Sequence, residues 1–168
     1  PPGLQRRQPL AAVHDAERLH ALMPGWPKGE LTRVQAYLFM ARNLGATDVD
    51  AALTWFDRAE DLLKEGAYST WQARSGNVYE EQGGSIEANM AYVLHHRANV
   101  LRQAALAKLA EAERSGNRAA AEQARSAAEA RWSQALAAVS ASEQAYARLN
   151  AFVNSGHQLL PNIENLRR

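Results

Sequence analysis

Two long alanine-rich segments, separated by a single break, constrain the fold of this chain more than any other feature. Eighteen of the forty-four residues 104–147 are alanine, the residue with the highest helix propensity. The break is the sequence Ser115, Gly116, Asn117, in which glycine can end one helix and asparagine can cap the next. We therefore expect residues 85–153 to form a long antiparallel helical hairpin.

A heptad pattern predicts how the two arms of this hairpin meet. The predicted seam residues of the second arm recur every seven positions and interleave at steps of three and four; they are Trp132, Val139, Tyr146 and Val153 with Ala128, Ala135, Ser142 and Leu149. In the first arm the predicted seam comprises Leu94, Ala98, Leu101, Ala105 and Ala112, with Lys108 as an interruption for which Leu109 substitutes. At ~1.5 Å per residue each arm would extend on the order of 40 to 55 Å. Part of the hairpin must then project or pair with another copy.

The first half of the chain predicts several shorter helices. Residues 1–8 have no periodicity and are expected to be a flexible lead-in, and residues 9–83 repeat apolar positions at helical spacing between glycine and proline boundaries. Pro9 fits a first helical turn, Gly45 a left-handed helix stop, and the residues from Thr47 to Asp50 a capping box. A further helix over residues 70–82 is expected to end at Gly83 and Gly84. With a C-terminal tail over residues 154–168, the prediction is one all-α domain spanning residues 1–168.

Composition and charge exclude several classes of protein. The 46% hydrophobic fraction contains much alanine, and aromatic residues make up only 7%, which favours closely packed helices over sheets. Nineteen basic and eighteen acidic residues are interspersed, so we expect no nucleic-acid partner. No apolar run is long enough to cross a bilayer. The absence of cysteine and of an initial methionine favours an exported or periplasmic protein slightly, although a cytoplasmic one stays open.

Two stretches of the first half resemble the tetratricopeptide repeat. Gly76, Tyr79, Gly83, Ala88 and Tyr92 match in order the small, aromatic, glycine, alanine and aromatic positions of that family. Residues 50–59 resemble the second helix of such a repeat. A shift of 36 residues aligns Ala52, Phe56 and Ala59 with Ala88, Tyr92 and His95. The resemblance covers about two degenerate units over residues 31–101, and a plain irregular helical bundle is the alternative fold.

The resemblance implies a peptide-binding groove along the first helices of the repeats. The residues that it places in this groove are Arg33, Tyr37, Arg74, Asn77, Glu80 and Glu81. Thr70 and Ala73 stand where the carboxylate-binding members of the family carry basic residues. We therefore do not expect recognition of a C-terminal carboxylate.

No catalytic motif is present: the chain lacks a nucleophile elbow, a phosphate loop and a dinucleotide fingerprint. The leading hypothesis is a non-enzymatic helical scaffold or adaptor that mediates protein–protein interaction or self-assembly in a bacterial complex, without a cofactor. An alternative is an all-α metal- or ligand-binding bundle that uses His14, Glu17 and His20, because Glu17 and His20 form one half of a di-iron carboxylate motif. The second half of that motif does not occur. A third hypothesis is a structural coiled-coil spacer.

Overall fold

The computed structural model describes residues 2–64 and 78–154. The described residues form α-helices joined by short turns, without a strand. The helices are α1 (Pro2–Leu22), α2 (Pro27–Leu44), α3 (Val49–Lys64), α5 (Val78–Arg114) and α6 (Arg118–Asn154). The all-α prediction is confirmed.

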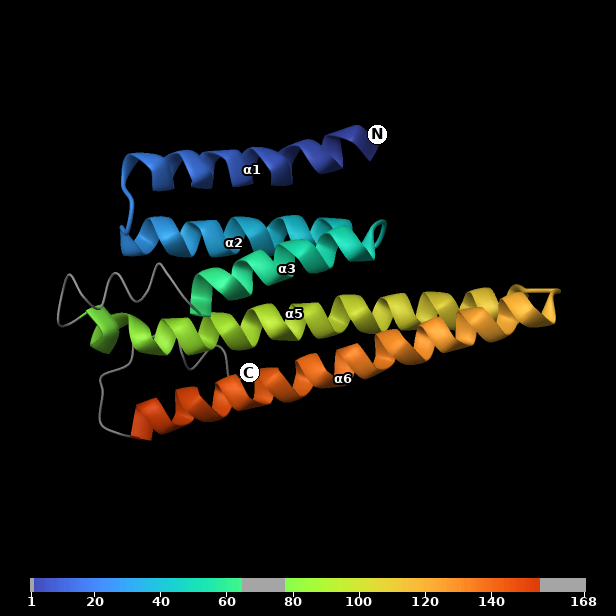
Figure 1. Cartoon of the computed structure of the whole chain (residues 1–168). Coiled ribbons are helices and arrows are strands. Elements are labelled where there is room, and N and C mark those ends of the chain that lie inside the picture. Colours follow the sequence, from blue (N-terminus) through green and yellow to red (C-terminus); the bar gives the residue numbers. More distant parts are fainter. Residues whose placement is uncertain (1, 65–77, 155–168) are drawn as a thin grey trace.

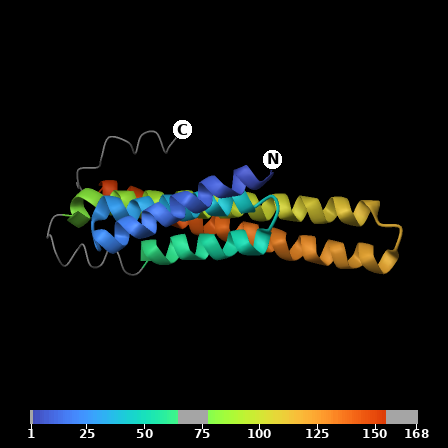
Figure 2. The ribbon, with the colours of Figure 1, turned by 90° about the horizontal axis from the view of Figure 1, so that it is seen from above.

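The helices are stacked largely in the order of the chain (Figure 1). α1 packs on α2, α2 on α3, α3 on α5, and α5 on α6, while α2 also reaches α5. The two 37-residue helices α5 and α6 extend beyond the short helices at the end that carries their connecting turn (Figures 1 and 2). The predicted sequence of short helices followed by a long alanine-rich hairpin is therefore correct, and part of the hairpin projects.

The turn of the hairpin forms as predicted. The side-chain Oδ1 of Asn117 accepts hydrogen bonds from the amides of Ala119 and Ala120, at 2.9 and 3.2 Å. These bonds satisfy two amides of the first turn of α6, which have no partner within the helix.

Small side chains fill almost the whole seam between α5 and α6. The hydroxyl of Ser142 donates a 2.9 Å hydrogen bond to the carbonyl of Ala91 and fixes the register of the two arms. The buried seam residues of α5 are Ala91, Leu94, Ala98, Leu101, Ala105 and Ala112, and those of α6 are Ala121, Ala124, Ala128, Ala135, Ala138, Ser142, Ala145 and Leu149. Both rows alternate in steps of three and four, apart from one polar residue in each, Lys108 and Arg131. A heptad seam of small residues allows the helix axes to approach closely.

The bulky half of the predicted seam is wrong. Trp132 and Val139 are 45% and 43% exposed, and Leu109, expected to replace Lys108, is 42% exposed. Tyr146 is only partly buried. The side chain of Val153 lies outside the described residues. Large side chains do not fit between helices that approach at alanine distance, so Ala124, Ala138 and Ala145 take their place.

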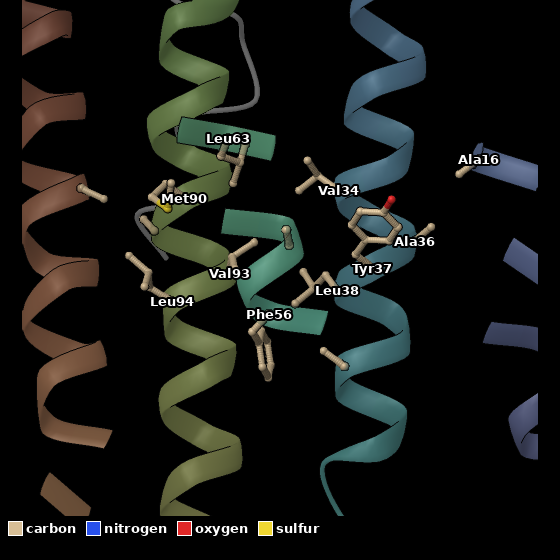
Figure 3. Packing of buried hydrophobic residues seen from close by; sticks show 14 of the residues in the cluster. Ala16, Val34, Ala36, Tyr37, Leu38, Phe56, Leu63, Met90, Val93 and Leu94 are labelled. Atoms are coloured by element: carbon tan, nitrogen blue, oxygen red, sulfur yellow. The ribbon is translucent and has the colours of Figure 1, made fainter. Parts of the chain in front are cut away.

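The main core lies where α2 and α3 pack against the near half of the hairpin (Figure 3). Phe56 of α3 is fully buried, and Val34 of α2 and Val93 of α5 are each 1% exposed. Gly45, after the end of α2, is required by a close approach to α5: a Cβ there would lie 2.7 Å from Cγ2 of Val100. Its φ of −54° is right-handed, so the predicted left-handed stop is wrong. The left-handed glycine is Gly25, between α1 and α2, with a φ of 78°.

Several helix boundaries differ from the predictions. α1 begins at Pro2, so residues 2–8 are helical rather than a flexible lead-in. Pro9 lies inside α1, where it removes one intrahelical hydrogen bond and is itself buried. The N-cap of α3 is Asp48 instead of Thr47, because its Oδ1 accepts a 3.0 Å bond from the amide of Ala51.

The predicted helix end at Gly83 and Gly84 is also wrong, because both glycines lie inside α5. Glycine costs about 1 kcal/mol relative to alanine in a helix but does not forbid one. The predicted start of this helix at residue 70 lies outside the described residues, as does Gly76.

Candidate interaction surface

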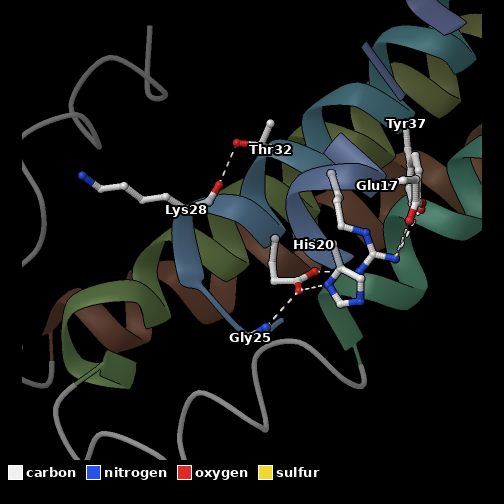
Figure 4. A network of polar contacts seen from close by, with 8 residues as sticks. Glu17, His20, Gly25, Lys28, Thr32 and Tyr37 are labelled. Atoms are coloured by element: carbon white, nitrogen blue, oxygen red, sulfur yellow. Dashed lines mark hydrogen bonds and ion pairs between the residues drawn. The ribbon is translucent and has the colours of Figure 1, made fainter. Parts of the chain in front are cut away.

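A polar network between α1 and α2 brings together residues from two of the sequence hypotheses (Figure 4). Glu30 of α2 is 1% exposed, and its carboxylate accepts hydrogen bonds from Nδ1 of His20 and, at 2.7 Å, from Nη1 of Arg33. The Tyr37 hydroxyl donates to the carboxylate of Glu17. Nη2 of Arg33 lies 3.5 Å from the other Glu17 oxygen. The network joins α1 to α2 through a charged guanidinium that lies between two carboxylates.

The charge state of Glu30 follows from these contacts. Burial by itself would raise the pKa of its carboxyl group, but the hydrogen bonds from Arg33 and His20, with the charges of these two groups, outweigh that effect. The pKa of Glu30 is therefore lowered below its ordinary value. The carboxylate stays ionised as one member of an ion pair that is almost completely shielded from water.

This geometry places Arg33 and Tyr37 inside the protein instead of on an open peptide groove. Tyr37 is 5% exposed, and its ring packs against Trp55 of α3 with a centroid distance of 5.4 Å. The side chain of Arg33 is 14% exposed, and its Nε has no acceptor among the described residues. Helix α1 contributes Glu17 and His20 to this face of α2. Arg33 and Tyr37 are therefore occupied by contacts within the chain.

The other predicted groove residues cannot be placed as a set. Arg74 and Asn77 lie outside the described residues. Glu80 and Glu81 belong to the first turn of α5, and their side chains are likewise outside the described part. Ala52, Phe56 and Ala59 are fully buried, whereas Tyr92 is 39% exposed and His95 is exposed. The two segments aligned by the 36-residue shift thus pack differently.

The residues of the metal hypothesis are only partly brought together. His20 and Glu17 both contact the network, but His14 is exposed and contributes nothing to it. Within residues 8–64 and 86–151, no group of three or more His, Asp or Glu side chains is arranged to hold a metal ion. The carboxylates of Glu17 and Glu30 are compensated by the Arg33 guanidinium.

A second set of ion pairs joins α3 to the part of the hairpin that the short helices cover. Nη1 of Arg97 on α5 lies 2.5 Å from Asp57 and 2.8 Å from Glu60, which is 8% exposed. Arg131 on α6 reaches Asp50, in the first turn of α3, at 2.6 Å. The Arg131–Asp50 pair marks where α3 stops covering α6. It also explains why an arginine occupies position 131 of the seam, since its partner is on α3 and not on α5.

A cavity of about 240 Å³ lies between the end of α2 and α5. Its lining includes Arg42, His96, Asn99 and Gln103. Burial, with smaller contributions from Arg42 and His95, lowers the pKa of His96 to about 4, so its imidazole is neutral at pH 7. Nε2 of His96 is buried without a hydrogen-bond partner. Most of the surface that lines the cavity is nevertheless apolar, and Gly45, Ala46 and Val100 contribute to it. The neutral ring of His96 packs edge-on against Tyr92.

The largest exposed apolar side chains of the hairpin lie along its outer surfaces. On α6 they are Trp132, Leu136 and Val139, with Leu136 57% exposed, and on α5 they are Leu106 and Leu109. In the sequence, the spacing of four and three residues between the α6 members is that of one helix face. This surface is not among the predicted sites, because the heptad pattern assigns Trp132 and Val139 to the seam. The pattern that could have identified it is the complete row of alanine and serine already present at heptad spacing.

No helix in the described ranges has the length and hydropathy needed to span a bilayer. Comparisons with protein-family models, with curated proteins and with solved structures find no match to this chain.

Proposed function

We propose that this protein is a non-enzymatic helical scaffold that mediates protein–protein interaction or self-assembly, with the projecting half of its hairpin as the interaction arm. We define the arm as residues 102–130, the part between Leu101, which contacts α3 around a shared pocket, and Arg131, which pairs with Asp50. The single observation that supports the proposal is that this arm projects from the short helices while carrying exposed leucines (Figure 1).

The distribution of small and large side chains in the arm favours a role in binding a partner. Its interior is a seam of alanines, which supplies little apolar burial per residue. The large apolar side chains Leu106 and Leu109, 46% and 42% exposed, lie on its outside. A chain that needed the arm only for its own stability would gain more by placing leucine inside. Leucine on the outside and alanine on the inside is the arrangement expected if the outer face of the arm is buried against a partner.

The alanine seam also favours the coiled-coil spacer as a second candidate function. A spacer needs a stiff rod of defined length, and a long heptad seam of small residues with a capped turn provides one. It does not need exposed leucines on the rod. An interaction arm therefore explains the exposed leucines, whereas a spacer does not. The peptide groove implied by the tetratricopeptide resemblance stays a prediction.

A site-specific photo-crosslinking experiment tests the arm. The crosslinking amino acid is placed at position 113, on the exposed side of α5, and the protein is expressed in its native host. We expect crosslinked adducts with another protein chain that are lost from a variant carrying Leu106→Glu and Leu109→Glu. A matched control is Leu22→Glu, because Leu22 is 72% exposed on α1, at the end of the molecule opposite the arm.

The proposal is contradicted if position 113 gives no protein adduct, or if adducts persist at equal yield in the Leu106 and Leu109 variant. Circular dichroism of each variant must show unchanged helix content, so that loss of an adduct reports on the surface and not on folding.

A further inference from the structure

One side of α6 carries an exposed row of apolar and charged residues that none of the described helices covers. We call it the outer face; it comprises Arg125, Glu129, Trp132, Leu136, Val139 and Glu143, all exposed. A second side of α6 forms the seam with α5. A third side, including Gln134, Ala137 and Ala141, lines pockets that involve α3. The outer face is therefore directed away from both neighbouring helices.

The order of residues on the outer face is self-complementary. Arg125 precedes Trp132 by seven residues, and Glu143 follows Leu136 by the same number. If two α6 helices pack antiparallel about the midpoint between Trp132 and Leu136, Arg125 lies opposite Glu143 of the partner subunit. Trp132 then lies opposite Leu136 of the partner subunit. The remaining pair is Glu129 opposite Val139 of the partner subunit, so the complementarity holds for four of the six residues. Two-fold symmetry repeats each of these contacts, as in an isologous interface.

The charged side chains at the two ends of the outer face form no ion pair with the described residues. In the described part of the protein, Arg118, Arg131 and Arg148 of α6 each pair with a carboxylate, whereas Arg125 and Glu143 form no ion pair. A parallel pairing of two α6 helices would place Arg125 opposite its own copy and Glu143 opposite its own copy. Like charges in such positions repel each other. The charge pattern favours the antiparallel orientation and disfavours the parallel one.

We propose that the outer face of α6 binds the same face of a second copy of this chain in antiparallel orientation. The contact is centred on two tryptophans and two leucines and is bounded by two Arg125–Glu143 pairs. The eighteen residue steps from Arg125 to Glu143 correspond to about 27 Å of helix. The inference goes beyond the proposed interaction arm, because four residues of the outer face lie outside residues 102–130, and it identifies a second copy as the partner of this additional surface. A two-helix contact of this length gives a dimer that dissociates on dilution.

Sedimentation equilibrium of the full chain over a range of concentrations measures this dimer directly. We expect a monomer–dimer equilibrium for the wild type and a dissociation constant at least about tenfold larger for Leu136→Glu, since the substitution places two carboxylates in the apolar centre. Leu22→Glu, which changes an exposed leucine on α1, should leave the constant unchanged. A wild type that stays monomeric at every concentration overturns the proposal, as does a dimer that Leu136→Glu does not weaken.

Charge reversal tests the orientation. Arg125→Glu makes both ends of the face acidic and Glu143→Arg makes both ends basic, so each variant alone should dimerise more weakly than the wild type. An equimolar mixture of the two should recover dimer, because each end of one variant then meets an opposite charge. The chain that carries both substitutions should also recover it. No recovery in the mixture overturns the antiparallel pairing.

The two proposals fail in distinguishable ways. If the wild type is monomeric but the crosslink from position 113 still depends on Leu106 and Leu109, the α6 pairing is wrong and the interaction arm stands. If the dimer forms and responds to Leu136 and to charge reversal, while position 113 captures nothing, the pairing stands and the arm is wrong.

Discussion

At the scale of single residues, Glu30 is the most consequential polar group in the described structure. Its carboxylate is nearly inaccessible to water and is shared between His20 of α1 and Arg33 of α2. The amide of Gly25, in the turn between these helices, lies 3.4 Å from the same carboxylate. One side chain therefore fixes both helices and the turn between them, and its loss would leave the guanidinium of Arg33 undercompensated.

We expect Glu30→Gln to lower the free energy of unfolding by about 2 kcal/mol at pH 7, because it removes charge-assisted hydrogen bonds. Urea denaturation followed by circular dichroism measures the change. The control Glu111→Gln breaks the exposed pair with Lys108 and should cost less than about 1 kcal/mol. Because folding lowers the pKa of Glu30, its contribution is present above its ordinary pKa of 4.5 and is lost as the pH falls through the folded value. Equal effects of the two substitutions would contradict this role.

The buried imidazole of His96 predicts a second pH dependence of folding stability, at higher pH than that of Glu30. The unfolded chain takes up a proton on this histidine near its ordinary pKa of 6.5, whereas burial lowers the pKa in the folded protein to about 4. Its contribution to stability is therefore complete above pH 6.5 and declines as the pH falls toward 4. Unfolding midpoints measured from pH 7 to pH 4 should decline less in His96→Gln than in the wild type. His14→Gln, on an exposed part of α1, should retain the wild-type slope.

At the scale of the elements, the hairpin depends on side-chain size more than on hydrophobicity. Ala105 of α5 is 1% exposed, and the register set by Ser142 and Ala91 places it opposite Ala128, which is 2% exposed. Neither site has room for a longer side chain unless the helices separate. The same constraint holds at the end of α2, where Gly45 allows contact with Val100. Small residues thus allow α5 to lie close both to α6 and to the end of α2.

We expect Ala105→Leu to destabilise the protein by about 1 to 3 kcal/mol, even though leucine is the more hydrophobic residue, because the seam is overpacked. Ala107→Leu, the same change on the exposed side of the same helix, should stay within about 0.5 kcal/mol of the wild type. Urea denaturation of both variants measures the difference. A stabilised Ala105→Leu protein would show that the seam is looser than the structure has it.

At the scale of the whole molecule, the protein divides into a covered base and a projecting arm. In the base, Phe56, Val34 and Val93 bury large apolar surfaces among α2, α3 and α5. In the arm, Gln103 still lines the cavity at the end of α2, and beyond it α5 and α6 meet mainly through alanine. Local stability follows the amount of apolar surface buried, so the arm and the base should open with different free energies.

Amide hydrogen exchange measures this difference. We expect amides of residues 102–130 to exchange faster than those of residues 88–101 and 135–149, although all three segments are helical. Ala105→Leu should speed exchange in the arm more than in α3. Uniform protection along both long helices would contradict the division into base and arm.

The helical secondary structure and the hairpin could be predicted from local sequence, apart from several helix ends. Alanine content and heptad spacing act locally, as do the glycine at 116 and the side-chain cap of Asn117, so they specify helices and a turn without knowledge of the partner surfaces. The heptad row through Ala128, Ala135, Ser142 and Leu149 was predictable for the same reason, and all four are buried. Helix ends were less accurate, because Gly83 and Gly84 lower helix propensity without preventing the helix.

Which helix faces are buried depends instead on the packing of the helices against one another. A sequence contains several heptad rows on one helix, and hydrophobicity alone favoured the row with Trp132 and Val139. The approach distance of α5 and α6 selected the smaller row and left the larger side chains outside. In the same way, the packing of α1 on α2 turned Arg33 and Tyr37 from expected groove residues into partners of Glu17 and Glu30. Both outcomes depend on how closely two helices approach each other, which the pattern within a single helix does not record.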